Sequence, residues 1–343
     1  MLKEFNLINL NHLKELNILI KKINKSKYEK IFFFPSNVYS NHISKKISKK
    51  KTFIIDNYSK KKGCIKPNDV TYEVNNLLIV TDKSLFIAQK FKKSLKTIFF
   101  RPKFKIKNKI NLDKKKPLNV NLSKLFVYFN SDKGKIYKRL NFEDKTHNYG
   151  VFYDKHFKYL KKDKLNILEI GSYRGSSTAA FLNYFKNATI FCVDINHKNF
   201  LFKSNRIKLI ELDYMKKNQV SKFVKNYQNF FDIVIDDGGH YKSHILSNIK
   251  NFYRCLKKEA SLYVIEDFGL KFNYLNDIKS ELDIFRIIKF LNNKIKFKSK
   301  ILDKNIQKRL TNSLKKISVY KGSWIKYNKN ISDICFWELK NLK

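Results

Sequence analysis

The fold is decided by residues 165–176, which read Leu165-Asn166-Ile167-Leu168-Glu169-Ile170-Gly171-Ser172-Tyr173-Arg174-Gly175-Ser176. An apolar strand ending near Glu169 runs into a turn with glycines at 171 and 175, and then into a helix. Such a turn lets the backbone approach a ligand closely, and the first turn of a helix offers free N–H donors. Tyr173 departs from the Gly-x-Gly-x-x-Gly pattern of dinucleotide-binding proteins. The stretch predicts a ligand-binding turn or, alternatively, a tight strand–helix connection without a ligand.

Further apolar runs continue this alternation towards the C-terminus. We expect strands at residues 166–170, 189–194, 207–212, 231–236 and 261–266, with helices between them and more strands within 316–340. Strands that alternate with helices are typical of an α/β fold with a mostly parallel sheet.

A smaller alternation precedes this region. Residues 1–27 are expected to form an amphipathic helix, and residues 28–110 a small α/β Rossmann-like module with strands near 31–34, 52–57, 77–81 and 97–100. Its first turn, at 35–37, holds no glycine, so a phosphate cannot easily approach that backbone. We interpret the module as structural or as a docking surface. Residues 111–160 are expected to form a linker and a lid segment, and residues 161–343 the second domain.

Composition limits the function classes. The chain has 343 residues, of which 43% are hydrophobic, which excludes general disorder. The net charge of +44 would suit a nucleic-acid partner. Nearly all of the excess is lysine, however, whereas readers of phosphates and bases favour arginine. Nucleic acid therefore stays open as a partner but is not favoured, and we interpret the charge as compositional drift.

The cysteines and the apolar runs predict a cytoplasmic protein. None of the four cysteines forms a Cys-x-x-Cys pair, and Cys192 and Cys335 lie inside apolar runs, as expected of buried thiols in a reducing compartment. The sequence has no apolar run of about 18 residues, so we expect no membrane span. Its N-terminus also lacks the apolar region of a signal peptide.

Several of the expected strands end in an acid. Asp194 ends the strand after Glu169, the position at which doubly wound folds bind the ribose hydroxyls of a nucleoside. Asp213 follows the next strand and is a weaker candidate, for contact with the adenine amine of such a nucleoside. Either acid could instead be an ordinary polar strand end.

Two later strands end in paired acids. Residues 231–240 read Phe-Asp-Ile-Val-Ile-Asp-Asp-Gly-Gly-His, which places Asp236 and Asp237 at a strand end, and the run from 262 ends in Glu266 and Asp267. Carboxylates that converge there repel one another unless they are protonated or hold a cation. Oxygen ligands favour Mg²⁺, Mn²⁺ or Ca²⁺. Glu266 and Asp267 can both contribute only if the strand has ended before Asp267, because neighbouring strand residues face opposite sides. Alternatively, one acid of each pair faces solvent or caps a helix.

His240 lies beyond a Gly-Gly turn after Asp237. A histidine beside the cation could act as a general base, since its side chain exchanges protons near neutral pH. It could also be a capping or core histidine. With His244, the pair could form the two-histidine, one-carboxylate site of iron oxygenases, a weaker interpretation because it leaves the glycine turn unexplained.

Taken together, these motifs resemble class I methyltransferases that use S-adenosylmethionine (SAM), in particular the metal-dependent macrolide-sugar O-methyltransferases and their cephalosporin-hydroxylase-like relatives. The resemblance covers about residues 130–340, including Ser131-Asp132-Lys133-Gly134 and the His147-x-Tyr149 element, although the spacing between these two elements departs from the family pattern. It implies a seven-stranded Rossmann-like domain with a C-terminal antiparallel hairpin.

The resemblance also implies residue roles. Mg²⁺ or Mn²⁺ would be bound by Asp237, Glu266 and Asp267, and His240 would be the catalytic base. The cofactor would be SAM, bound by Glu169, Gly171, Ser172, Gly175, Asp194, Asp213, Asp236 and Tyr149.

The predicted function is metal-assisted methyl transfer from SAM to a hydroxyl of a sugar or another small-molecule or glycan acceptor. A nucleic-acid methyltransferase is an alternative, but the Asn/Asp-Pro-Pro-Tyr/Phe motif of enzymes that methylate base amino groups is replaced by Asp-Asp-Gly-Gly-His. A non-catalytic SAM-binding scaffold and an iron oxygenase are further alternatives. The sequence leaves a homo-oligomer open.

Overall fold

The computed structural model describes residues 15–34, 43–47, 50–55, 64–65, 76–80, 96–99, 109–139, 142–144, 146–269, 280–326, 329–330 and 332–340. The chain divides into two compact units. The first comprises residues 1–105 with 138–144, and the second residues 106–137 with 145–343. The expected turn at 35–37 lies outside the described residues.

The first unit holds a five-stranded sheet. Its strands are β1 (Lys30–Phe34), β2 (Lys51–Ile55), β3 (Cys64–Ile65), β4 (Asn76–Val80) and β5 (Lys96–Phe99). Their order is β3-β2-β1-β4-β5, and all four pairings are parallel. The helical residues 15–24 place Leu16 and Ile20 in one buried cluster with Ile31 and Phe33 of β1. The prediction of a small parallel α/β module is therefore confirmed.

The second unit is built on a seven-stranded sheet in the order β12-β10-β9-β13-β14-β18-β15. Its strands are β9 (Asn166–Ile170), β10 (Thr189–Asp194), β12 (Ile207–Glu211), β13 (Ile233–Asp236), β14 (Leu262–Glu266), β15 (Leu314–Lys321) and β18 (Asp333–Leu339). Strand β18 runs antiparallel to both of its neighbours, β14 and β15, and all other pairings are parallel. The expected mostly parallel sheet with an antiparallel C-terminal hairpin is confirmed.

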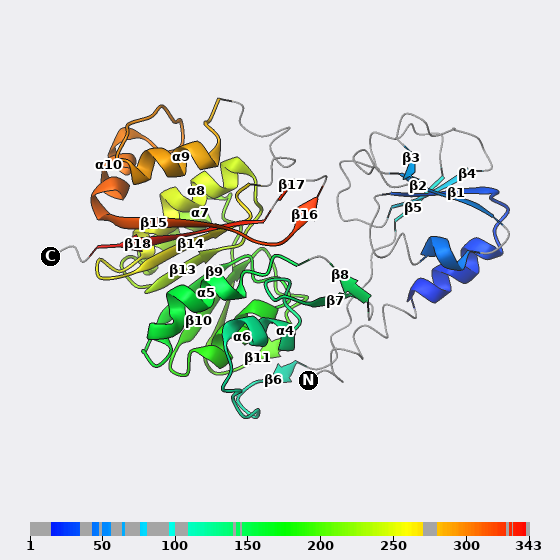
Figure 1. Cartoon of the computed structure of the whole chain (residues 1–343), viewed down its shortest axis with the longest axis horizontal. Helices are drawn as coiled ribbons and strands as arrows, with labels where there is room; N and C mark the ends of the chain where they lie inside the picture. Colours follow the sequence, from blue (N-terminus) through cyan, green and yellow to red (C-terminus); the bar gives the residue numbers. More distant parts are fainter. Residues whose placement is uncertain are drawn as a thin grey trace. The chain divides into compact units, whose positions relative to one another are not determined.

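Helices cover both faces of this sheet (Figure 1). On one face lie α4 (Leu122–Tyr128), α5 (Gly150–Phe157) and α6 (Ser176–Tyr184). On the other lie α7 (Lys217–Asn226), α8 (Lys242–Phe252), α9 (Ile284–Asn292) and α10 (Lys304–Ser313), whose apolar residues share one buried cluster with the strands. With both faces covered, the central strands β9, β13 and β14 are buried along almost their whole length rather than at alternate residues, as parallel strands usually are.

The second unit and its borders also contain short elements. They are 3₁₀ turns at Lys158–Leu160 and Tyr253–Cys255, and the paired strands β6 (Ile110–Asn111) with β11 (Phe202–Lys203), β7 (Tyr137–Arg139) with β8 (Phe142–Asp144), and β16 (Ile325–Lys326) with β17 (Lys329–Asn330). No helix in the described part of the chain is long and apolar enough to cross a membrane.

The register of the central strands sets the position of the site. Asp236 of β13 lies beside Ile170 of β9 on one side and Ile265 of β14 on the other. The residues that follow these three strands therefore emerge together at the carboxyl edge of the sheet, where open α/β sheets bind their ligands.

Candidate active site at the carboxyl edge of the large sheet

The glycine turn after β9 packs directly against the turn after β13. Gly171 has φ +85°, a conformation that side chains disfavour, and its N–H donates to the Val193 carbonyl at 2.8 Å. A Cβ added at Gly171 would lie 2.1 Å from the carbonyl oxygen of Asp237. Gly175 has φ +74°, and a Cβ added there would lie 2.5 Å from Cζ of the Phe200 ring. Both glycines are therefore required by backbone conformation and by close approach.

Replacing Gly171 with alanine is expected to destabilise the fold by roughly 2–5 kcal/mol, because a left-handed backbone costs about 1–2 kcal/mol and an overpacked contact about 1–3 kcal/mol. Urea unfolding measures the change. Gly238→Ala is the matched control, since its Cβ would approach no atom more closely than the Tyr214 hydroxyl, at 3.1 Å. Equal destabilisation by the two variants would contradict the packing argument.

Glu169 is fully buried beneath the turn. The hydroxyls of Ser177 and Thr178, in the first turn of α6, donate hydrogen bonds to its two carboxylate oxygens. Burial raises the pKa of Glu169 to about 7, although the two hydroxyls oppose the change. The carboxylate thus ties the end of β9 to the start of α6, and its contact with a cofactor stays a prediction.

Glu169→Gln is expected to increase the free energy of unfolding by about 3 kcal/mol at pH 8, because ionising the buried acid costs about 1.4 kcal/mol per pKa unit. The folded pKa exceeds the ordinary value of 4.5. Stability of the wild type should therefore fall as pH rises from about 4.5 to 7, and the difference between the two proteins should vanish below pH 4. Urea unfolding at pH 4, 6 and 8 measures it, with exposed Glu211→Gln as control. If the stability of Glu169→Gln depended on pH as that of the wild type does, Glu169 would not be the source of the pH dependence.

The turn also presents polar groups suited to a ligand. Asp194, at the end of β10, accepts a hydrogen bond from the Tyr173 N–H at 2.8 Å. The hydroxyl of Ser172 is buried and has no hydrogen-bond partner among the described residues. A buried hydroxyl without a partner is costly unless a bound group satisfies it. The turn therefore fits a polar cofactor between Gly171 and Asp194.

Asp213 and Asp236 are engaged by their own loops. Asp213 accepts from the Met215 N–H at 3.0 Å. Asp236 is buried, and its Oδ1 accepts from Asn248 Nδ2 at 3.0 Å and from the Gly238 N–H at 3.3 Å. The predicted contacts of both acids with the cofactor stay predictions.

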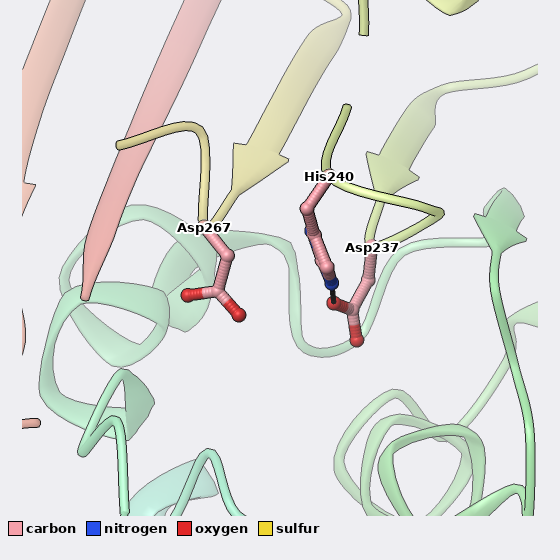
Figure 2. A group of neighbouring side chains, drawn as sticks. All are labelled: Asp237, His240 and Asp267. Atoms are coloured by element: carbon pink, nitrogen blue, oxygen red, sulfur yellow. Dashed lines mark ion pairs between the residues drawn. The ribbon is translucent and has the colours of Figure 1, made fainter. Parts of the chain in front are cut away.

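Asp237 and Asp267 face the same space from neighbouring strand ends (Figure 2). With His240 they offer ligand atoms that all lie within 4.8 Å of one another. Strand β14 ends at Glu266, and Asp267 has a left-handed backbone with φ +54°. The chain has thus left the strand at Asp267, the condition under which Asp267 can turn towards the site. Two carboxylates and a histidine form a donor set that fits a divalent ion.

Glu266, the other predicted ligand, is engaged within the protein. Its Oε2 accepts a hydrogen bond from the Lys133 ammonium at 2.7 Å, and its Oε1 accepts from the Tyr153 hydroxyl. The same ammonium donates to Asp237 Oδ2 at 2.5 Å. Burial opposes the charge of Lys133, but attraction to Asp237 and Glu266 outweighs it and raises the pKa of Lys133 well above its ordinary value. The ammonium therefore bridges two of the three acids.

His147 and Tyr149 bind the third acid. His147 Nδ1 lies 3.1 Å from Asp267 Oδ1, and the Tyr149 hydroxyl donates to the same oxygen. Burial opposes charge on His147, but attraction to Asp267 outweighs it and raises the pKa of His147 to about 9. The reciprocal attraction, which outweighs burial, lowers the pKa of Asp267 to about 2. Asp267 is therefore ionised at neutral pH, and the predicted contact of Tyr149 with a cofactor stays a prediction.

His240 lies beside Asp237, on the side that faces Asp267 (Figure 2). Its Nε2 is 3.7 Å from Asp237 Oδ1, and its backbone is left-handed with φ +52°. Strained backbone of this kind is common at functional sites. The His244 ring, in contrast, lies against Tyr214, with Nδ1 3.3 Å from the hydroxyl. The structure groups His240 with Asp237 and Asp267, which does not favour the two-histidine iron site.

Lys133 and Tyr153 are site residues to which the sequence analysis assigned no role. Lys133 belongs to the Ser131–Gly134 element that carries the resemblance. Tyr153 lies one helical turn after Tyr149, so both hydroxyls leave the same side of α5. The four-residue spacing from Tyr149 is therefore the feature of the sequence that could have predicted Tyr153 as a site residue.

Comparisons with known proteins find a family model and several relatives that this chain resembles. The model of a family described as "FtsJ-like methyltransferase" matches residues 152–326, just over half of the chain. Mycinamicin VI 2''-O-methyltransferase of Micromonospora griseorubida is 29% identical over 128 residues, which cover 35% of this chain and 31% of the relative. Demethylmacrocin O-methyltransferase of Streptomyces fradiae is 28% identical over 128 residues, which cover 35% of this chain and 32% of the relative. The matches thus span about a third of the length of these curated relatives.

A third relative and a solved structure complete the comparison. The relative is 8-demethyl-8-alpha-L-rhamnosyl tetracenomycin-C 2'-O-methyltransferase of Streptomyces olivaceus, 26% identical over 35% of this chain and 33% of its own length. The structure is the MycE methyltransferase of the mycinamycin biosynthetic pathway in complex with Mg and SAH. It is 21% identical, covers 65% of this chain and 56% of its own, and has a TM-score of 0.47.

Proposed function

The chain belongs to the FtsJ-like methyltransferase family, and from this premise we propose that it transfers a methyl group from SAM to a hydroxyl of a sugar-containing small molecule or glycan, assisted by Mg²⁺ or Mn²⁺. One observation carries the proposal: the glycine turn and the acid cluster are in direct contact. A Cβ at Gly171 would lie 2.1 Å from the Asp237 carbonyl, and the Asp237 N–H donates to the Ile170 carbonyl at 2.9 Å. A cofactor on the turn would therefore lie beside the cation site.

The cofactor site would use the turn after β9 and the acid of β10. Gly171 and Gly175 allow close approach, Ser172 offers its unpartnered hydroxyl, and Asp194 would accept from the ribose hydroxyls. When bound, SAM would supply a methyl group carried on a positively charged sulfur. The acceptor oxygen would attack the methyl carbon in line with that sulfur, so that the oxygen–carbon bond would form as the sulfur–carbon bond broke and the sulfur would leave as a neutral thioether.

The acid cluster would prepare the acceptor. Asp237 and Asp267, with Glu266 as the third predicted ligand, would hold a divalent ion, which would lower the pKa of a bound hydroxyl and fix its position. His240, beside the same carboxylates, would take the hydroxyl proton as the general base. Tyr149 and His147 hold Asp267 in place through hydrogen bonds to one of its oxygens. No nucleophilic serine or cysteine is needed, because the acceptor oxygen attacks directly.

Two further observations support the acceptor class and the location. The relatives are named as O-methyltransferases, and one name includes a rhamnosyl group, which supports a sugar hydroxyl as acceptor. Cys192, Cys255 and Cys335 are buried and unpaired, which supports a cytoplasmic location.

Calorimetric titration with SAM tests the proposed cofactor. Asp194→Ala is expected to weaken SAM binding roughly 10–100-fold, since hydrogen bonds to a charged group contribute about 1.5–3 kcal/mol. Asp163→Ala, which removes an exposed acid of the same unit, is the control and should bind SAM as the wild type does. A wild-type protein that does not bind SAM would refute the proposed function.

A further inference from the structure

Tyr214 reaches the loop that carries His240 from a different part of the sheet. It lies in the connection between β12 and α7, and its hydroxyl accepts a hydrogen bond from the Gly239 N–H at 2.7 Å. Burial raises the pKa of Tyr214 to about 12, so the hydroxyl is uncharged at neutral pH and keeps its lone pairs for the amide. Tyr214 therefore joins the loop after β12 to the loop after β13.

Hydrogen bonds tie the loop after β13 to neighbouring segments at both of its ends. At its start, the Asp237 N–H donates to the carbonyl of Ile170 in β9 at 2.9 Å. At its far end, the Gly239 N–H donates to the Tyr214 hydroxyl. This second bond is made by the residue directly before His240, so it fixes the part of the loop from which the imidazole projects.

Gly239 packs tightly enough for the contact to be specific. A Cβ added at Gly239 would lie 2.8 Å from the Tyr214 hydroxyl and 2.3 Å from His244 Nδ1. A side chain at this position would therefore push the amide away from the hydroxyl. The absence of a Cβ is what allows the backbone to lie between the two rings.

The position of His240 depends on its backbone. Its φ of +52° is unfavourable for a histidine and persists only where the surroundings fix it. Within the part of the chain that the structure describes, no hydrogen bond holds its ring, and Nε2 lies 3.7 Å from Asp237 Oδ1. The residues on either side must therefore hold it: helix α8 begins after its N-cap Tyr241, and Gly239 precedes it.

We propose that Tyr214 is a positioning residue: by holding the Gly239 amide it fixes the backbone of His240, and thereby places the imidazole beside Asp237. The inference rests on the proposed function and deepens it. A general base acts only within hydrogen-bond reach of the proton that it removes. A displacement of about 1 Å can lower a rate by about 10²-fold, so one hydrogen bond next to the base has a measurable effect.

Hydrogen exchange of the Gly239 amide tests the contact itself. The chain has nine glycines, and Gly238-Gly239 is its only Gly-Gly pair. In full-length protein labelled with ¹⁵N and ¹³C-carbonyl glycine, Gly239 is thus the amide bonded to a labelled carbonyl, which identifies its NMR signal. Tyr214→Phe keeps the ring and is expected to accelerate exchange of this amide about tenfold, because its hydrogen bond is lost.

Tyr227→Phe is the matched control for the amide measurement. Tyr227 lies at the end of α7, and its hydroxyl makes no hydrogen bond within the described residues. This variant should leave the exchange of Gly239 unchanged. If Gly239 exchanged at the wild-type rate in Tyr214→Phe, the inference would be overturned whatever the enzyme's activity.

A double-mutant cycle tests the consequence for His240. The rate is that of methyl transfer from labelled SAM to methyl α-L-rhamnoside, a simple glycoside of the class named for one relative. Tyr214→Phe is expected to lower kcat about tenfold and to keep the KM for SAM within about twofold. In a His240→Asn background it should lower kcat by less than about twofold, because the base that Tyr214 positions is already absent.

The results of the cycle separate a positioning role from a general structural one. A loss of equal size in the two backgrounds would show that Tyr214 does not act through His240. An unchanged kcat in Tyr214→Phe, with the Gly239 amide exposed, would overturn the inference as well. Failure of the proposed function has a different result, a wild-type protein that does not bind SAM, and amide exchange would still decide whether Tyr214 holds Gly239.

Discussion

Replacing His240 with alanine is expected to lower kcat by roughly 10²–10⁴-fold while SAM binding is retained, which is the range for losing a general base. The imidazole lies 3.7 Å from Asp237 Oδ1, over the carboxylates that would hold the acceptor, whereas the cofactor turn involves other residues. The rate of methyl transfer measured in a single turnover, together with SAM titration, separates the two effects.

Two further variants sharpen this prediction. His240→Asn tolerates the left-handed backbone better than alanine does, so a loss shared by both variants cannot come from backbone strain. His244→Ala removes the next histidine of the chain, which lies against Tyr214, and is expected to keep most of the activity. Unchanged kcat in both His240 variants would remove His240 from the catalytic role.

The strands of the large sheet were predictable because their signal is local. Apolar runs that end in an acid, such as the one ending at Glu266, predict both the strand and its end. The last strands were harder to place. Strand β15 (Leu314–Lys321) has an exposed and partly charged sequence, and its pairing with β18 decides its structure. Strand β3 has two residues, which is too short for any periodic pattern.

The site was likewise predictable where its signal is local, and not where it depends on packing. Asp237, Glu266 and Asp267 follow neighbouring strands, and parallel topology alone brings such residues together. Lys133 and Tyr153 reach the cluster from segments next to α4 and within α5, whose packing on the sheet no local pattern shows. For the same reason the occupied state of Glu266 could not be foreseen. The local sequence predicts the acids, whereas tertiary packing decides which of their oxygens accept hydrogen bonds from other parts of the protein.

Removing divalent ions with a chelator is expected to lower activity at least about 10²-fold, and added Mg²⁺ or Mn²⁺ should restore it. Without the ion, the acceptor hydroxyl keeps a pKa close to that of water, about 15.7, so very little is ionised at neutral pH. Lys133 cannot replace the ion, because its ammonium is held between Asp237 and Glu266 by two short hydrogen bonds.

The assay is methyl transfer from labelled SAM to sugar hydroxyl acceptors, before and after chelation. Calorimetry of SAM binding under both conditions is the control, since the turn after β9 holds none of the proposed ion ligands and should bind SAM equally well. Full activity in the chelator would show that the reaction does not need the cation. Asp267 would then serve only as the buried partner of His147, and the rate would depend on His240 and on the alignment of the two substrates.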